Sequence, residues 1–245
     1  MKNLLRRVLQ SAYSAVSHGS YNERLLEENV WHHVFRESFR TTQWKSELGL
    51  SIGRWAGGAS FFYILHRVLE DVKPEKVVEL GLGESSKLIS SYASNEDWLK
   101  SHIILEHSKT WIAAFCDRFR LSENSEIRRH ELFGKTQNCG FTDSLRYRDI
   151  EIDIWQHATL VVVDGPFGSE SYSRMNSLDF IRQLLPESRF VLILDDSHRV
   201  GEKETLTEIR NLLSEQKITY HEKEYGGMKS CTIVCSHHFP WLASL

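Results

Sequence analysis

Residues 76–87 of the chain read Lys-Val-Val-Glu-Leu-Gly-Leu-Gly-Glu-Ser-Ser-Lys. The apolar run at 77–80, which ends at a glycine, predicts a short buried strand. Gly81 and Gly83 predict a tight turn after it, because glycine adopts backbone angles that other residues resist. A helix is expected to begin near residue 87, with one serine of Ser85-Ser86 as its cap. A strand, a glycine turn and a helix start in this order are typical of α/β proteins that bind a nucleotide-like ligand at the turn.

The rest of the chain repeats this alternation of strand and helix. Apolar runs predict strands at 102–105, 126–132, 159–163 and 189–194, and helical spacing predicts helices at 59–72, 108–119, 172–185 and 203–215. Two last strands, 218–221 and 231–236, flank Gly226-Gly227 and predict an antiparallel hairpin. The order predicts an α/β, Rossmann-like fold, with a mostly parallel seven-stranded sheet, helices on both faces and a C-terminal antiparallel hairpin.

The start of the chain differs in character from the rest. Residues 1–55 read as a helical N-terminal extension, and residues 56–245 as one α/β domain. In the extension, Trp31, Phe35 and Phe39 recur every four residues and predict an apolar stripe along a helix. Such a stripe packs in the core, binds a partner or covers a substrate as a lid. A homodimer through the N-terminal helices is the partner arrangement that we expect from it.

Composition limits the classes of partner. Of the 245 residues, 41% are hydrophobic and 26% are charged, which is typical of soluble globular proteins. The net charge of −3 argues against a nucleic-acid partner held by bulk charge. No run approaches the ~18 apolar residues that a transmembrane helix needs. The four cysteines lack the spacing of a metal site, so reduced thiols and a cytoplasmic location are expected; they are Cys116, Cys139, Cys231 and Cys235.

Two acidic residues mark the ends of the first two strands. Glu79 lies two residues before Gly81, where a carboxylate would repel the pyrophosphate of a dinucleotide but would attract the sulfonium and ammonium groups of S-adenosylmethionine. Glu106 lies 25 residues beyond Gly81, close to the ~20-residue spacing at which an acid binds ribose hydroxyls. The alternative is that Glu106 only caps the next helix. His107 and Trp111 are expected either to flank an adenine ring or to pack in the fold.

The motifs between residues 74 and 236 resemble those of the class I S-adenosylmethionine-dependent methyltransferases. The pattern Glu79-x-Gly81-x-Gly83 resembles the first motif of that family, and Val163-Asp164-Gly165-Pro166 and Leu194-Asp195-Asp196 resemble the branch with V-D-G-P after the fourth strand and an acid pair after the fifth. Glucuronoxylan-methyltransferase-like proteins and several bacterial small-molecule or sugar methyltransferases are similar there. The resemblance implies methyl transfer to an oxygen of a small-molecule or sugar acceptor. It also implies that S-adenosylmethionine is bound by Glu79, Gly81, Gly83, Ser85, Glu106, His107 and Asp164.

Three aspartates follow two strands that should be neighbours in such a sheet. Asp164, Asp195 and Asp196 are therefore expected to converge at the cofactor edge, where unpaired carboxylates would repel one another. A divalent cation such as Mg²⁺ would relieve that repulsion and would lower the pKa of a bound acceptor hydroxyl. Catechol-type O-methyltransferases have similar acids, although Asp196 stands where that family usually has Asn. The alternative is that Asp164 orders its turn while Asp195 or Asp196 caps a helix.

Other roles stay open on the sequence. His198 and Asp164 are the candidate catalytic bases, and His198 is alternatively a residue of a helix start. Arg174 and Arg199 either hold an anionic acceptor or face solvent. The alternative functions are an NAD-type Rossmann oxidoreductase and a catalytically silent methyltransferase-fold partner protein. Ser86 argues against the oxidoreductase, because a dinucleotide fingerprint has its third glycine there.

Overall fold

The computed structural model describes residues 2–133 and 144–245, with side chains from residue 20 onward. Seven strands form the main sheet: β1 (Lys76–Leu80), β2 (Ser101–Glu106), β3 (Ser125–Arg129), β6 (Leu160–Val163), β7 (Val191–Leu194), β8 (Tyr220–Tyr225) and β9 (Cys231–Ser236). The α-helices are α1 (Lys2–Phe39), α2 (Gln43–Glu47), α3 (Ala59–Val72), α4 (Glu84–Asn95), α5 (Lys109–Cys116), α6 (Ser177–Ile181) and α7 (Val200–Glu215). Two short strands, β4 (Leu132–Phe133) and β5 (Arg146–Tyr147), pair separately.

The main sheet has the strand order β3-β2-β1-β6-β7-β9-β8. The first five of these strands are parallel, whereas β9 pairs antiparallel with both β7 and β8. The predicted mostly parallel seven-stranded sheet and its C-terminal antiparallel hairpin are therefore confirmed. The strands β6 and β7 are apolar on both faces because each face is covered by other parts of the chain, and β1 is buried in the same way except at Lys76.

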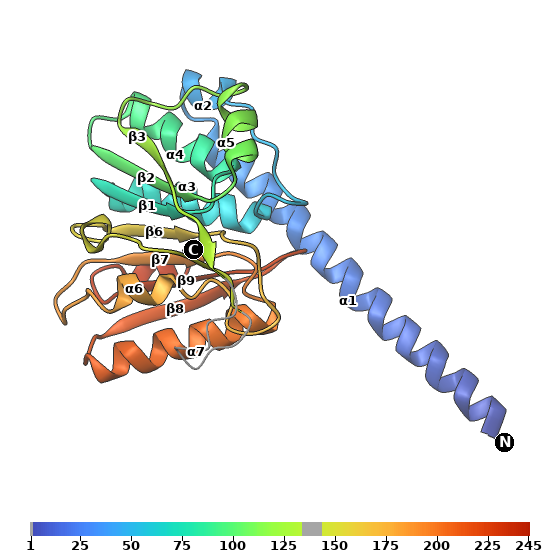
Figure 1. The fold of residues 1–245 in the computed structure, drawn as a ribbon. Coiled ribbons are helices and arrows are strands. Elements are labelled where there is room, and N and C mark those ends of the chain that lie inside the picture. Colours follow the sequence, from blue (N-terminus) through green and yellow to red (C-terminus); the bar gives the residue numbers. More distant parts are fainter. Residues whose placement is uncertain (1, 134–143) are drawn as a thin grey trace.

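Helices cover the two faces of the sheet with different cores (Figure 1). On one face, residues of α3 and α4 such as Leu65 and Leu88 pack against Val77 and Val162. On the other face, residues of α6 and α7 pack against Val78 and Val161. Alternate residues of each strand thus enter opposite cores, as the pleat of a strand requires.

The C-terminal half of α1 joins the first of these cores, while its N-terminal half projects away from the rest of the molecule (Figure 1). Phe35 and Phe39 are buried, and Trp31 packs partly buried against Tyr63 and Tyr225. The apolar stripe predicted for this helix is therefore mainly part of the core. Glu28, one turn before Trp31, accepts hydrogen bonds from the backbone N–H groups that start α3 and follow β8.

Two helix predictions are wrong at their boundaries. The helix expected at 172–185 is reduced to α6, because Tyr172 and Arg174 adopt left-handed backbone angles that interrupt it. The helix expected near residue 87 already begins at Glu84, and the Ser86 hydroxyl accepts a hydrogen bond from the Gly83 N–H at 2.9 Å. The Ser86 side chain therefore caps the helix from its third residue.

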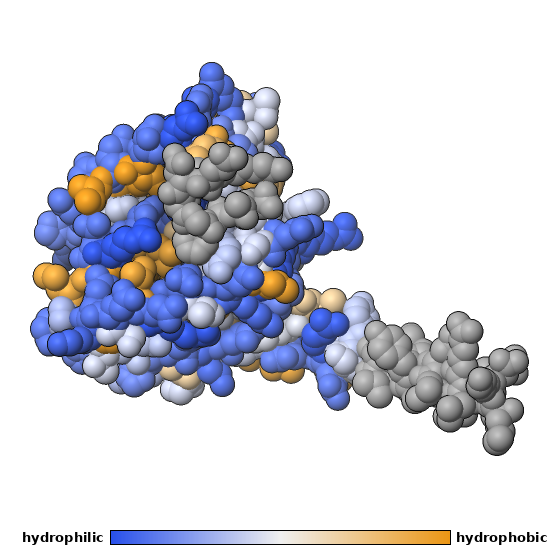
Figure 2. Space-filling view, turned by 60° about the horizontal axis from the view of Figure 1, so that its bottom comes forward, coloured by the Kyte–Doolittle hydropathy of each residue, from blue (hydrophilic) through white to orange (hydrophobic). Residues whose placement is uncertain are grey.

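The described surface is mostly hydrophilic on the face seen in Figure 2, with small and separate hydrophobic groups. No helix in the described part of the chain is long and apolar enough to cross a membrane. Cys116, Cys231 and Cys235 are free thiols, whereas Cys139 lies outside the described residues.

Candidate active site

The carboxyl ends of four neighbouring strands form one edge of the sheet, and the residues that follow them face the same space. Leu80 at the end of β1 is in register with Leu105 in β2 and with Val163 in β6. The ladder continues past the strands, since the Asp164 N–H donates to the Leu80 carbonyl at 2.9 Å. The Asp195 N–H donates likewise to the Val163 carbonyl at 3.0 Å. The glycine turn and the predicted acidic residues are thereby brought to one edge.

The turn after β1 lies directly against the turn after β6. Gly81 has a φ of +103°, and a Cβ added to it would lie 3.0 Å from the backbone nitrogen of Gly165. A Cβ added to Gly165 would lie 2.7 Å from the Gly81 Cα. Both glycines are required because any side chain would push the two turns apart. Gly83 differs, since a Cβ there would meet open space.

Glu106 ends β2 and holds the glycine turn in place. One carboxylate oxygen, Oε2, accepts a hydrogen bond from the Leu82 N–H at 3.2 Å. The other, Oε1, accepts from the N–H groups of His107 at 2.7 Å and Ser108 at 2.8 Å. A carboxylate oxygen has two lone pairs, so Oε2 keeps one of them for a ligand. The carboxylate can therefore accept one ribose hydroxyl through Oε2.

Aromatic groups border this part of the edge. The His107 ring lies with its Nδ1 2.9 Å from Glu106 Oε1 and makes an edge contact with Phe167 at a centroid distance of 5.2 Å. Trp111 donates from its indole N–H to the Leu82 carbonyl at 2.6 Å. Trp111, from α5, therefore contacts the glycine turn directly, and Phe167, which follows the β6 turn, contacts the His107 ring. Phe167 was not expected from the sequence, although it directly follows the V-D-G-P motif.

Glu79 is placed differently from the expectation of a carboxylate open to a cationic ligand. Its side chain is completely buried, and its Oε2 lies 3.1 Å from the Nε2 of His102 in the neighbouring strand. His102 in turn contacts the hydroxyl of Ser125 at 3.1 Å. Glu79, His102 and Ser125 lie on the same face of three neighbouring strands. Their side chains therefore form a buried chain of contacts that joins β1, β2 and β3. Ser85 is also buried, in the first turn of α4.

The three aspartates come together as the order of strands predicted. One oxygen from each of Asp164, Asp195 and Asp196 lies within 4.8 Å of the others. Both carboxylate oxygens of Asp195 are buried without a hydrogen-bond partner among the described residues. Asp196 has a φ of +56°, a left-handed conformation that aspartate tolerates better than most residues. The set of oxygens has the chemistry that a hard divalent cation prefers.

An arginine already occupies this cluster of acids. The Arg174 guanidinium is buried and donates to Asp164 Oδ1 at 3.2 Å and to Asp196 Oδ2 at 2.9 Å. Its other terminal nitrogen donates to the main-chain carbonyls of Val163 and Asp195. Arg199 and Lys229 approach Asp196 at 3.0 and 3.5 Å, and Glu202 lies 3.6 Å from the Arg174 Nε. Arg174 therefore neither faces solvent nor waits for an acceptor, and three cations partly neutralise four acids.

The environments of the three aspartates drive their pKa values apart. Burial, and then the charge of Asp195, raise the pKa of Asp164 well above its ordinary value. Burial and the charge of Asp196 raise the pKa of Asp195 to about 6. For Asp196, burial is outweighed by Arg174, Lys229 and Arg199, which hold its pKa below the ordinary value. Asp164 keeps 22% of its side chain exposed, so it is the member of the cluster that a ligand can reach.

His198 follows the cluster on the surface. Its Nδ1 accepts a hydrogen bond from the Ser230 N–H at 3.4 Å, and burial lowers the pKa of the ring. With Nδ1 as the acceptor, the neutral ring carries its proton on Nε2. Nε2 is then a donor to a bound ligand and not a base for it.

Tyr147 is a site residue that the sequence did not identify. It is buried, and its hydroxyl has no hydrogen-bond partner in the described chain. A Cβ on Gly165 would lie 2.9 Å from that hydroxyl, so the oxygen lies where the turns after β1 and β6 meet. Burial and the charge of Glu106 raise the pKa of Tyr147 well above its ordinary value, which keeps the hydroxyl protonated as a donor. A strand of two residues gives no sequence signal for this role.

The fold is similar to that of several solved structures. A protein from Klebsiella pneumoniae described as a "putative O-methyltransferase" superposes with a TM-score of 0.51 and 12% identity, over 89% of this chain and 99% of that one. The chain has the class I methyltransferase fold. A "putative caffeoyl-CoA O-methyltransferase" from Staphylococcus aureus matches with a TM-score of 0.46 and 12% identity, over 83% of this chain and 91% of that one. The METTL16 methyltransferase domain matches with a TM-score of 0.48 and 12% identity, over 86% of this chain and 78% of that one.

The likeness to the Klebsiella structure concerns the fold, because the sequences have diverged. No protein-family model matches the sequence, and no curated protein matches it. The methyltransferase fold predicted from the strand order and the terminal hairpin is confirmed. The antiparallel β9, inserted between β7 and β8, is the feature that separates it from the six parallel strands of a dinucleotide-binding fold.

Proposed function

We propose that this protein transfers the methyl group of S-adenosylmethionine to a hydroxyl oxygen of a small-molecule or sugar acceptor. One observation carries the proposal: the turn that would hold the donor, at Gly81, packs against the turn that carries Asp164. A basic carboxylate is thereby held beside the place of the donor. The methyltransferase fold supports methyl transfer as the type of reaction. The acid cluster supports the choice of a hydroxyl oxygen as the acceptor, because a carboxylate can take the proton of a hydroxyl.

The cofactor would be held by residues from three elements. Glu106 has a free lone pair on Oε2 for a ribose hydroxyl, and Tyr147 has a protonated hydroxyl without a partner among the described residues. His107 and Phe167 offer ring faces beside the turn. S-adenosylmethionine supplies an electrophilic methyl group, whose bond to sulfur breaks as the bond to the acceptor oxygen forms, with S-adenosylhomocysteine as the leaving group.

Asp164 is the proposed catalytic base. Its raised pKa makes it a stronger base than an ordinary carboxylate, and it is partly exposed at the strand edge. It takes the proton of the acceptor hydroxyl as the oxygen attacks the methyl group. His198, with its proton on Nε2, would donate a hydrogen bond to the acceptor. Arg174 holds Asp164 in position and limits the charge of the cluster.

A divalent cation is the alternative means of activating the acceptor. Asp164, Asp195 and Asp196 would hold it. The Asp195 oxygens have no hydrogen-bond partner among the described residues, and this favours the arrangement. Arg174 opposes it, because its guanidinium already neutralises Asp164 and Asp196. A bound cation would have to share these carboxylates with the arginine.

The partners that we propose follow from the surface and the charge. The net charge of −3 favours a small acceptor over a nucleic acid. Leu25, Leu26 and Val30 are exposed on the projecting helix α1 and favour a homodimer through this element. We propose a cytoplasmic location on the reduced thiols.

The test is methyl transfer from S-adenosylmethionine carrying a tritiated methyl group to a panel of catechols, other phenols and sugars, with NAD binding measured in parallel. We expect label in a hydroxyl-bearing acceptor, and we expect Asp164→Asn to lower kcat by roughly 10²–10⁴-fold, the usual contribution of a general base. Affinity for S-adenosylhomocysteine in the variant should stay near that of the wild type. Binding of NAD instead, or binding of no cofactor, would favour the oxidoreductase or the silent partner protein.

A further inference from the structure

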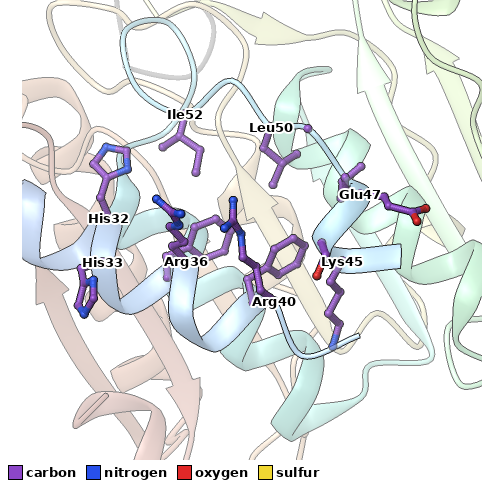
Figure 3. A pocket seen from close by; sticks show the side chains of 13 residues that line it. His32, His33, Arg36, Arg40, Lys45, Glu47, Leu50 and Ile52 are labelled. Atoms are coloured by element: carbon purple, nitrogen blue, oxygen red, sulfur yellow. The ribbon is translucent and has the colours of Figure 1, made fainter. Parts of the chain in front are cut away.

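A hollow lies away from the carboxylate cluster, between α1 and the segment that follows it. It encloses about 610 Å³ and is lined by α1, by α2 and by residues 48–52 (Figure 3). This volume suits a small organic molecule. The three walls differ in chemistry, and that difference indicates what the pocket binds.

The charged wall comes from α1. Arg36 and Arg40 lie one helical turn apart, and both side chains extend toward Leu50 and Ile52 across the pocket (Figure 3). Both residues are exposed, and neither has an ion-pair partner within the described residues. Like charges at this spacing repel each other, so the pair is destabilising unless an anion lies between them.

The other charged groups of the lining do not compensate these two arginines. Lys45 is buried and paired with Glu70 at 2.5 Å. Glu47, the acid of the lining, accepts a hydrogen bond from Gln43 at 2.8 Å and lies on α2. The pocket therefore presents two guanidinium groups that have no ion-pair partner among the described residues, and such groups bind a carboxylate or a phosphate through paired hydrogen bonds.

The remaining walls are apolar. Phe35 and Phe39 are buried beneath the arginines, and Leu48, Leu50 and Ile52 are partly buried in the facing segment. An inorganic ion would leave these surfaces in water, whereas an apolar acid would cover them. The combination fits a ligand with an apolar body and one anionic group.

The facing segment is tied to the start of α4. The Ser51 N–H donates to Glu84 Oε2 at 2.9 Å, and the Lys87 ammonium donates to the Gly49 carbonyl. Glu84 is the first residue of α4, directly after the glycine turn. The apolar wall is therefore held in place by its hydrogen bonds to α4 and does not depend on a ligand for its position.

We propose that this pocket is a binding site for an amphipathic anion, whose carboxylate or phosphate is held by Arg36 and Arg40 and whose apolar part covers Leu50 and Ile52. The site is separate from the carboxylate cluster, and its ligand binds whether or not the chain transfers methyl groups. Ligand binding thus fails or succeeds independently of the catalytic proposal.

The test is calorimetric titration of the full chain with phenyl phosphate, benzoate, inorganic phosphate and benzyl alcohol. We expect phenyl phosphate or benzoate to bind more tightly than both inorganic phosphate and the neutral alcohol. Arg36→Gln and Arg40→Gln should each weaken binding roughly tenfold, which corresponds to about 1.4 kcal/mol. Arg24→Gln, on the same helix but outside the pocket, is the matched control and should bind as the wild type does.

The apolar wall has its own variant. Leu50→Ser should weaken phenyl phosphate more than inorganic phosphate, because only the organic ligand covers that side chain. Comparison of phenyl phosphate with benzoate distinguishes a phosphate ligand from a carboxylate ligand. The proposal is overturned if neither organic anion binds at ~10 mM, an affinity below that of any specific small-ligand site. Equal affinity in the two arginine variants and the wild type, or equal binding of the alcohol, would overturn it as well.

Discussion

Replacement of Glu106 by alanine tests how the fold holds its proposed cofactor. The carboxylate accepts three main-chain hydrogen bonds, from Leu82, His107 and Ser108, and keeps one lone pair free on Oε2. The variant removes the proposed hydrogen bond to a ribose hydroxyl. A hydrogen bond to a charged group contributes about 1–3 kcal/mol, so affinity for S-adenosylhomocysteine should fall roughly 5- to 150-fold.

The same change should lower the free energy of unfolding. The Leu82 N–H lies in a buried part of the turn and loses its acceptor, which costs about 1–3 kcal/mol. The two quantities are measured separately, the affinity by calorimetry and the stability by urea unfolding. Glu126→Ala is the control, because Glu126 lies on the neighbouring strand β3 and its exposed carboxylate pairs with Arg128, away from the glycine turn. This control should change neither quantity by much.

One result would refute the reasoning. If folded Glu106→Ala binds S-adenosylhomocysteine within twofold of the wild type while its stability falls, Glu106 acts only on the turn and on the start of α5. The cofactor would then have to be held by other groups.

Three further changes test the glycine turn, a buried histidine and the metal. Gly81→Ala should lose both stability and affinity for S-adenosylhomocysteine, because its Cβ would lie 3.0 Å from the backbone of the turn after β6. Gly83→Ser should fold normally and change the affinity alone, because a Cβ there meets open space. Equal losses of stability of the two variants in urea unfolding would contradict this difference. Burial lowers the pKa of His66 from 6.5 to about 4, so between these pH values the unfolded chain takes up a proton that the folded chain refuses. The free energy of unfolding should fall by up to about 3 kcal/mol as the pH drops from 6.5 to 4. His66→Gln should lose this part of the pH dependence of urea unfolding. The same pH profile in the variant and the wild type would show that the ring titrates normally. If a cation activates the acceptor, EDTA should abolish turnover and Mg²⁺ or Mn²⁺ should restore it. Asp164→Asn should remove this response to the metal. Full turnover of metal-free protein in EDTA would instead leave Asp164 as a metal-independent base.

The elements of the fold could be read from the sequence because each depends on residues close together in the chain. The apolar run at 159–163 and the helix at 59–72 correspond to β6 and α3 within a residue. Gly226-Gly227 between two short strands sufficed for the antiparallel pairing of β8 with β9. The convergence of Asp164 with Asp195 also followed, since the carboxyl ends of neighbouring parallel strands share one edge.

Pairings between distant residues could not be read in this way. The sequence left Arg174 either to solvent or to an acceptor, and a helix was expected around it; the structure gives it a left-handed backbone and a buried place among the aspartates. Glu79 had the spacing of a cofactor ligand, yet its carboxylate points across the sheet toward His102. No motif marked Tyr147, whose buried hydroxyl has no hydrogen-bond partner within the described part of the chain.

The sequence by itself determined the order and type of the main strands and helices, and which aspartates reach the carboxyl edge, because these follow from local periodicity and from the direction of the chain. The tertiary structure alone decided which charges are neutralised. Arg174 contacts Asp164 and Asp196 because the pairing of β6 with β7 brings the two aspartates together and the left-handed angles between these strands place the arginine beside them. Neutralisation depends on distances of about 3 Å between side chains, and only the packed structure sets such distances.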